Sequence, residues 1–166
     1  AARDCLREMN VDLADAEICV EKSAEGAPRI HVPGRGVELA GASIAHAGGI
    51  AVGAVAPPPW RIGVDYDLPG RIRDPGNFTD AILSAREAAR LQVTGDADTA
   101  AMLWGLKEAA AKALGIGLQG RPQEFEIVAF DGAAGLAHVE NQGRRVEACA
   151  RRVGDGICTL GYVLPS

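Results

Sequence analysis

The last third of this chain constrains its fold more than any other part. Residues 123–166 contain runs in which apolar and polar side chains alternate, and glycine-containing turns separate the runs. A period of two is typical of half-buried strands, and consecutive strands joined by short glycine turns pair antiparallel. The runs are "FEIVAF", "GLAHVE", "RRVEACARR" and "ICTLGYVL". This segment therefore predicts an antiparallel meander.

Two alanine-rich segments that precede the meander have apolar residues at helical spacing. Residues 78–92 predict a helix with Thr79 as its N-cap. A second helix is expected from about Thr99 to Leu114, where Gly115 ends it. The predicted fold class is α+β, with helices packed on antiparallel sheets.

The first part of the chain predicts a smaller half. We expect the end of a helix over residues 1–10, a strand over 16–22, and turns over 25–36 before a short strand, "VEL". Residues 43–56 are small and apolar and are interrupted by Gly48-Gly49, which predicts a strand or loop followed by a buried strand. Three prolines at 57–59 stiffen a connector. We take them as the junction between residues 1–56 and residues 57–166.

Composition narrows the function. The 166 residues carry a formal charge of −5 and no long basic run, which disfavours nucleic-acid binding. No run of eighteen apolar residues is present, so we expect no membrane span, and the N-terminus lacks a secretory hydrophobic region. The four cysteines have no metal-ligand spacing and are expected as free thiols. These features favour a cytoplasmic protein.

Two aspartates end the strand predicted over residues 61–67. Asp65 and Asp67 are two positions apart, so their carboxylates point to the same face while Tyr66 points to the other. Carboxylates this close repel unless a cation or hydrogen-bond donors lie between them. Such a pair suits Mg²⁺, which takes oxygen ligands from carboxylates, water and phosphate. The alternative is a solvated strand end.

The second predicted helix carries three charges in the segment "WGLKEAAAKALG". Glu108 and Lys112 lie one turn apart on the same stripe as Trp104, and Lys107 flanks that stripe. Without further information, Glu108 and Lys112 would form a surface ion pair. The nearby "GIGLQG" matches a dinucleotide-binding glycine pattern, but it follows a helix instead of opening one, so we discard that reading.

These motifs together resemble those of the 4′-phosphopantetheinyl transferases. "GVDYD", followed about forty residues later by "WGLKEAAAK", is similar to that family's paired signature. "SIAHAGGIAVGAVA" resembles its upstream histidine segment, with His46 at the histidine position. "ALGIGLQG" followed by "EFEIV" also resembles the stretch after the family's catalytic helix. Three motifs in the same order are far more specific than any one of them.

The resemblance implies a fold of two pseudosymmetric halves and an Mg²⁺-dependent enzyme. Members of this family transfer 4′-phosphopantetheine from coenzyme A to a serine of an acyl or peptidyl carrier protein, releasing 3′,5′-ADP. By resemblance, Asp65, Asp67 and Glu108 hold Mg²⁺ against the diphosphate of coenzyme A. A metal ion and a lysine there neutralise charge as the phosphoanhydride bond breaks.

The same resemblance implies the other site residues. Glu108 would accept the proton of the carrier's serine, directly or through a water, and Lys112 would reach the departing phosphate oxygen. His46, Lys107 and Lys112 would contact coenzyme A, with His46 at the 3′-phosphate. The alternative for His46 is a packed histidine in a strand of small residues.

This chain departs from the family pattern at four places. They are Asp67 where Glu is common, Ala45 and Ala47 where serines flank the histidine, Ala27 in place of a lysine, and Gly105 in place of a serine. The candidates to replace that lysine are Arg29 and Arg35. These departures leave open a non-catalytic module that docks carriers or scaffolds a megasynthase.

The chain is also shorter than the larger members of the family, and it has no initiator Met. We therefore expect a truncated N-terminal half and a domain of a longer protein, such as an enediyne-type polyketide synthase. A fused pair of halves would be monomeric, whereas a truncated one can form a homo-oligomer.

Overall fold

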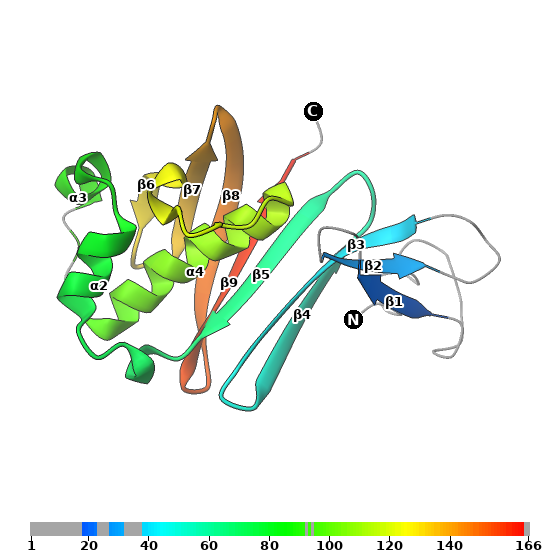
Figure 1. Cartoon of the computed structure of the whole chain (residues 1–166), viewed down its shortest axis with the longest axis horizontal. Coiled ribbons are helices and arrows are strands. Elements are labelled where there is room, and N and C mark those ends of the chain that lie inside the picture. Colours follow the sequence, from blue (N-terminus) through cyan, green and yellow to red (C-terminus); the bar gives the residue numbers. More distant parts are fainter. Residues whose placement is uncertain (1–17, 23–26, 32–37, 92, 94, 165–166) are drawn as a thin grey trace.

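A computed structural model gives the arrangement of the chain, and it describes residues 18–22, 27–31, 38–91, 93 and 95–164. Within these residues the fold is α+β, with two antiparallel sheets and helices against the larger one (Figure 1). The predicted fold class is confirmed. The expected helix end over residues 1–10 lies outside the described residues. No helix among those described is long and apolar enough to cross a membrane.

The smaller sheet has the strand order β1-β2-β3-β4. Its strands are β1 (Cys19–Lys22), β2 (Pro28–His31), β3 (Glu38–Ala47) and β4 (Ile50–Ala56). The prediction of turns over 25–36 missed β2, which is only four residues long. Residues 43–56 form a hairpin whose turn, Gly48-Gly49, has positive φ at both positions. Glycine adopts that conformation without steric cost, so this pair fixes where the chain reverses.

The larger sheet has the strand order β5-β9-β8-β7-β6. The strands are β5 (Arg61–Asp67), β6 (Glu126–Asp131), β7 (Leu136–Asn141), β8 (Arg144–Val153) and β9 (Gly156–Val163). Consecutive strands β6 to β9 pair antiparallel, which confirms the predicted meander. Strand β5 joins the meander at its free end by pairing with β9.

The helix predicted over residues 78–92 is two helices, so its N-cap was wrong. Helix α2 (Pro75–Ile82) begins after Asp74, whose side chain accepts a hydrogen bond from the Asn77 backbone N–H. Helix α3 (Ala85–Leu91) follows. Ser84 and Glu87 bond reciprocally to each other's backbone N–H groups, and this capping box starts the new helix.

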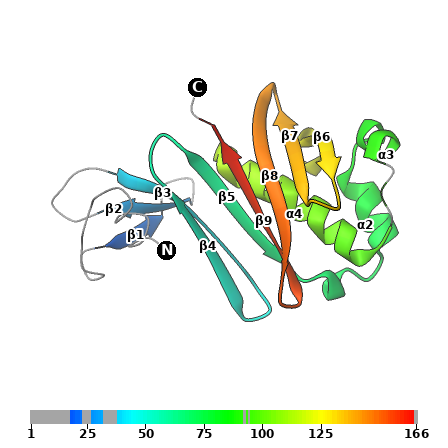
Figure 2. The ribbon, with the colours of Figure 1, turned by 180° about the vertical axis from the view of Figure 1, so that it is seen from behind.

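Helix α4 (Ala97–Leu114) is the predicted second helix, and Gly115 ends it in a left-handed conformation. It lies across one face of the larger sheet, which is seen from the opposite side in Figure 2. Two short 3₁₀ turns, η2 (Pro69–Arg71) and η3 (Pro122–Glu124), flank the helices. The core between helix and sheet contains Leu103, Leu106, Ile127, Val139 and Val146.

Paired glycines bring α4 unusually close to the sheet. Gly63 of β5 and Gly161 of β9 are register partners. A Cβ atom at Gly63 would lie 2.0 Å from the Ala109 carbonyl oxygen, and one at Gly161 would lie 2.9 Å from the Ala109 carbonyl carbon. No side chain fits between the helix and the sheet here, so α4 rests directly on β5.

The β3–β4 hairpin contacts β5 and links the two sheets. The Val64 backbone N–H of β5 donates a 2.9 Å hydrogen bond to the Ser43 hydroxyl of β3. Ala45 packs against Val64 and Tyr66. Both sheets therefore share a small apolar core on the side of β5 that faces away from α4.

Candidate functional site

The two aspartates of β5 face α4. Gly63, two residues before Asp65, lies directly under that helix, whereas Tyr66 packs with the β3–β4 hairpin on the other face. Asp65 Oδ1 accepts a 2.7 Å hydrogen bond from Lys112 Nζ, and that ammonium also donates to the Val64 carbonyl oxygen at 3.0 Å. The strand and the helix are thus joined through Asp65 and Lys112, which are 47 positions apart.

Asp67 and Glu108 lie close enough to Asp65 for their charges to interact. Burial, with the Asp65 charge adding to it, raises the pKa of Asp67 to about 6. Burial raises the pKa of Glu108 as well, and the charges of Asp65 and Asp67 add to this shift. The positive charge of Lys112 opposes it. Three carboxylates therefore gather around one lysine, and full ionisation of all three is unfavourable.

This carboxylate cluster, Asp65, Asp67 and Glu108, has the donor chemistry of a divalent cation site. Hard cations take carboxylate oxygens, and a positive charge would relieve the repulsion that raises two of these pKa values. Within the described residues no three acidic, His or Cys side chains form a ready-made metal-binding group, and the Lys112 ammonium lies on Asp65. The residues fit a divalent cation once Lys112 moves from Asp65 to a neighbouring anion.

Lys107 lies elsewhere, although sequence reasoning grouped it with the coenzyme A contacts. Its side chain is fully buried, and its ammonium donates to Glu87 Oε1 at 2.6 Å. It also donates to the carbonyl oxygens of Pro122 and Phe125. Burial lowers the pKa of Lys107, while the bond to Glu87 opposes that shift. The structure therefore corrects its role: Lys107 is a core residue.

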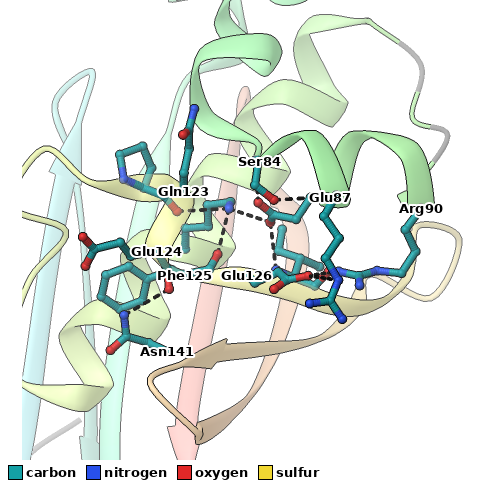
Figure 3. A network of polar contacts seen from close by, with 12 residues as sticks. Ser84, Glu87, Arg90, Gln123, Glu124, Phe125, Glu126 and Asn141 are labelled. Atoms are coloured by element: carbon teal, nitrogen blue, oxygen red, sulfur yellow. Dashed lines mark hydrogen bonds and ion pairs between the residues drawn. The ribbon is translucent and has the colours of Figure 1, made fainter.

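Glu87 of α3 is the centre of that core network (Figure 3). In addition to Lys107, it accepts hydrogen bonds from the backbone N–H groups of Ser84 and Ile127 at 2.8 Å each. One buried carboxylate thus ties α3 and α4 to the start of β6. The sequence analysis placed Lys107 beside the stripe of Glu108 and Lys112, and only the tertiary contact reveals its pairing with Glu87.

Two adjoining pockets, each of about 550 Å³, open beside Lys112. Both are lined by Ala27, Ala42, Lys112 and Gly115, so they lie between the smaller sheet and the end of α4. Ala27, which lines both pockets, occupies the position where the family pattern has a lysine.

Two arginines contribute to the first pocket. Arg29, one of the two candidates to replace the missing lysine, lines it, and Arg35, the other candidate, lies outside the described residues. Arg61 also lines it, and its guanidinium donates to the Leu114 carbonyl oxygen at the end of α4. The sequence carried no signal for Arg61, which follows a proline-rich segment that was interpreted only as a connector.

A separate groove of about 480 Å³ lies on the opposite side of the carboxylate cluster. It is lined by Asp67, Arg71, Phe78 and Trp104 among others, and the two aromatic rings meet edge to face. Trp104 is one helical turn before Glu108, and Lys112 is one turn after it. The carboxylate cluster therefore lies between a basic pocket and a partly apolar groove.

His46 is exposed on β3. Strand alternation puts it on the same face as Ala42 and Ile44, which line the second pocket. Its neighbour Ala45 is buried against β5 instead. The histidine is thus not packed in the core, and it extends the strand face that borders the pocket.

Comparisons with known proteins agree with this geometry. Residues 61–160 match the family model described as the 4′-phosphopantetheinyl transferase superfamily. A holo-[acyl-carrier-protein] synthase of Campylobacter lari is 36% identical over 63 residues, which are 38% of this chain and 52% of that relative. The match therefore spans about half the length of that relative. The family match begins at β5 and includes all of α4, so it contains the carboxylate cluster.

Proposed function

This chain belongs to the 4′-phosphopantetheinyl transferase superfamily, and from that membership and the site geometry we propose that it transfers 4′-phosphopantetheine from coenzyme A to a serine of a carrier protein. The reaction joins the serine oxygen to the β-phosphorus of coenzyme A and breaks the bond from that phosphorus to the bridging oxygen. The products are a holo-carrier protein and 3′,5′-ADP. The synthase relative supports the same activity.

The carboxylate cluster would hold the cation that this reaction uses, which we propose is Mg²⁺. When bound, the cation would neutralise the diphosphate and the charge that develops on it. Asp65 contributes a carboxylate already oriented toward α4, and Asp67 is held two residues further along the same face. Glu108 supplies the third carboxylate from the helix, and its raised pKa is consistent with a group that needs a nearby positive charge.

Two side chains of α4 would act on the reacting groups. Lys112 is a half-buried cation whose anionic partner in this structure is Asp65, and an incoming diphosphate offers it a more highly charged one. There it would stabilise the oxygen that departs with 3′,5′-ADP. Glu108 would accept the proton of the carrier's serine hydroxyl, directly or through a water, because its carboxylate lies in the cluster beside Lys112.

The basic pocket beside Lys112 would hold the nucleotide end of coenzyme A. Arg29, Arg61 and Lys112 supply positive charge there, and the pocket lies against the strand that carries His46. We propose that His46 contacts the 3′-phosphate. Replacing His46 with alanine should weaken binding of coenzyme A but not of dephospho-coenzyme A, which lacks that phosphate. Equal loss for both ligands would argue against this contact. The proposed halves, residues 1–56 and 57–166, would enclose this end of the ligand between them.

One observation carries the proposal: residues 47 positions apart, Asp65 and Lys112, meet beside Glu108 and Asp67 within the region that matches the family. The test is incubation of the protein with coenzyme A, Mg²⁺ and a panel of apo-carrier proteins, read by intact mass. Asp65→Ala and Glu108→Gln should each lower the rate of carrier mass gain by on the order of 100-fold or more. Chelation of the metal should have the same effect.

The matched control is Glu140→Gln, which removes a partly buried carboxylate of β7, on the face of the sheet opposite α4. It should retain wild-type activity. Wild-type activity in Asp65→Ala or Glu108→Gln would refute the site. If the wild-type protein binds coenzyme A weakly or not at all and modifies no carrier, a non-catalytic docking module becomes the better account.

A further inference from the structure

Thr159 is a buried polar residue on β9 of the larger sheet. The residue is 1% exposed, and its hydroxyl has no hydrogen-bond partner among the residues that the structure describes. Most buried hydroxyl groups in folded proteins are paired, because leaving one unpaired costs about 1–3 kcal/mol. An unpaired hydroxyl in this position therefore calls for an explanation.

The position of Thr159 is next to the carboxylate cluster. Thr159 and Asp65 are register partners on β9 and β5, and both face α4. Side chains directly opposite each other on antiparallel strands have Cβ atoms about 4.5–5.5 Å apart. A threonine hydroxyl and an aspartate carboxylate on Cβ atoms this close can reach each other.

Helix α4 leaves room for this hydroxyl at Gly105, which has no side chain. A Cβ atom at Gly105 would lie 2.8 Å from both Oγ1 and Cγ2 of Thr159. Thr159 therefore fills the space that a side chain at position 105 would otherwise occupy. Strand β9 thus supplies the hydroxyl, and the absence of a side chain at Gly105 of α4 leaves the space for it.

We propose that Thr159 is a positioning residue for Asp65, donating a hydrogen bond that orients the carboxylate once Lys112 leaves it for the substrate. This inference rests on the proposed function, because it assumes that Asp65 binds a cation there. Lys112 holds Asp65 Oδ1 in this structure, and its departure leaves that carboxylate needing a new donor. The Thr159 hydroxyl is a buried donor on the residue that pairs with Asp65 across the strands. Groups that orient a ligand carboxylate typically change metal affinity by about 10- to 100-fold.

The test measures Mg²⁺ binding in the presence of coenzyme A by calorimetry, together with the unfolding free energy of the metal-free protein. Thr159→Val keeps the shape and removes the hydroxyl, so it should weaken Mg²⁺ binding by about tenfold. The metal-free stability should stay the same or rise, because no hydrogen bond is lost. Thr159→Ser should restore the affinity.

A second route to rescue is the double variant Gly105→Ser with Thr159→Ala, which returns a hydroxyl to the same space from the helix. It should bind Mg²⁺ more tightly than Thr159→Ala alone. The matched control is Thr79→Val, because Thr79 of α2 also has a buried hydroxyl without a partner in the described part of the chain but is not beside Asp65. Its Mg²⁺ affinity should equal that of the wild type.

Unchanged Mg²⁺ affinity in Thr159→Val would overturn the proposal, as would a loss that Thr159→Ser does not recover, since the hydroxyl would then not account for the affinity. If the wild-type protein binds no Mg²⁺ with coenzyme A, the proposed cation site fails and Thr159 fails with it. The two failures are therefore distinguishable from the wild-type measurement alone.

Discussion

Lys107, Glu108 and Lys112 lie within two turns of α4 but have different surroundings. Lys107 points into the core beside Glu87, where every proton of its ammonium has an acceptor. Glu108 and Lys112 are only half-buried and lie over the β5 carboxylates. Solvent access therefore separates Lys107, a structural charge, from Glu108 and Lys112, the candidate functional ones. Two predictions concern single residues of these two environments.

The first concerns Asp67 in metal-free protein. Its pKa is raised to about 6, so between about pH 4 and pH 6 the folded state binds more protons than the unfolded state. This stabilising contribution is present below pH 4 and is lost as pH rises through 6. Asp67→Asn lacks it. The variant should therefore gain stability relative to wild type across this window, by roughly 1–2 kcal/mol, because solvent screens part of the effect.

The measurement is urea unfolding at several pH values with a chelator present. A stability difference between variant and wild type that does not change between pH 4 and pH 7 would contradict the prediction. Added Mg²⁺ should reverse the order at pH 7, because the wild type would then gain more from the cation.

The second prediction concerns Lys107. Lys107→Met leaves the Glu87 charge buried without its cation, so unfolding free energy should fall by about 3–5 kcal/mol. The double variant Glu87→Gln with Lys107→Met removes that charge and should recover part of the loss. Glutamine keeps one oxygen, which can accept from the backbone N–H of either Ser84 or Ile127 but not both, because these two groups bond to different oxygens of Glu87. Whichever variant folds should keep the wild-type KM for coenzyme A, and a large rise in KM would return Lys107 to the ligand site.

At the scale of elements, the contact between α4 and β5 determines the site. Gly63 and Gly161 allow the helix backbone to touch the sheet, and this contact puts Lys112 within hydrogen-bond distance of Asp65. The capping box at Ser84 and Glu87 separates α2 from α3, and Glu87 then reaches the core. The contact at Gly63 and Gly161 therefore sets how closely α4 lies against the sheet.

Gly63→Ala should be strongly destabilising for this reason. The added methyl group would lie 2.0 Å from the Ala109 carbonyl oxygen, and neither backbone can move without displacing α4. We expect a loss of about 3 kcal/mol or more in chemical unfolding. The control is Gly53→Ala, another strand glycine whose Cβ would meet nothing closer than 3.9 Å. If both substitutions have similar small effects, the close approach of α4 is not required.

At the scale of the whole molecule, the two sheets share contacts at β5. Ser43 satisfies the Val64 backbone N–H, and Ala45 completes the apolar cluster with Val64 and Tyr66. The basic pocket is lined from both sides of this junction. The halves should therefore unfold together.

We expect a single transition in which far-UV circular dichroism and tryptophan fluorescence coincide. Ser43→Ala leaves the buried Val64 N–H without its acceptor and should lower stability by about 1–3 kcal/mol while the transitions still coincide. Two separate transitions in the wild type would mean that the sheets are independent units.

Local patterns in the sequence were enough for much of this protein. Period-two alternation and glycine turns specify strands β6 to β9, because strand geometry alternates side chains and glycine tolerates positive φ. The same alternation puts Asp65 and Asp67 on one face. The motif spacing led to the superfamily, and Gly115 ends α4 where expected.

Only the tertiary structure decided which charges belong to the candidate site. Sequence spacing cannot tell whether a helix charge such as Lys107 meets solvent or a buried partner, since that depends on α3 and β6 packing around it. Nor could it find Arg61 or Thr159, whose roles come from neighbours more than 50 positions away. Burial and long-range contacts are properties of the packed chain, and they determine the pKa values and partners on which the chemistry depends.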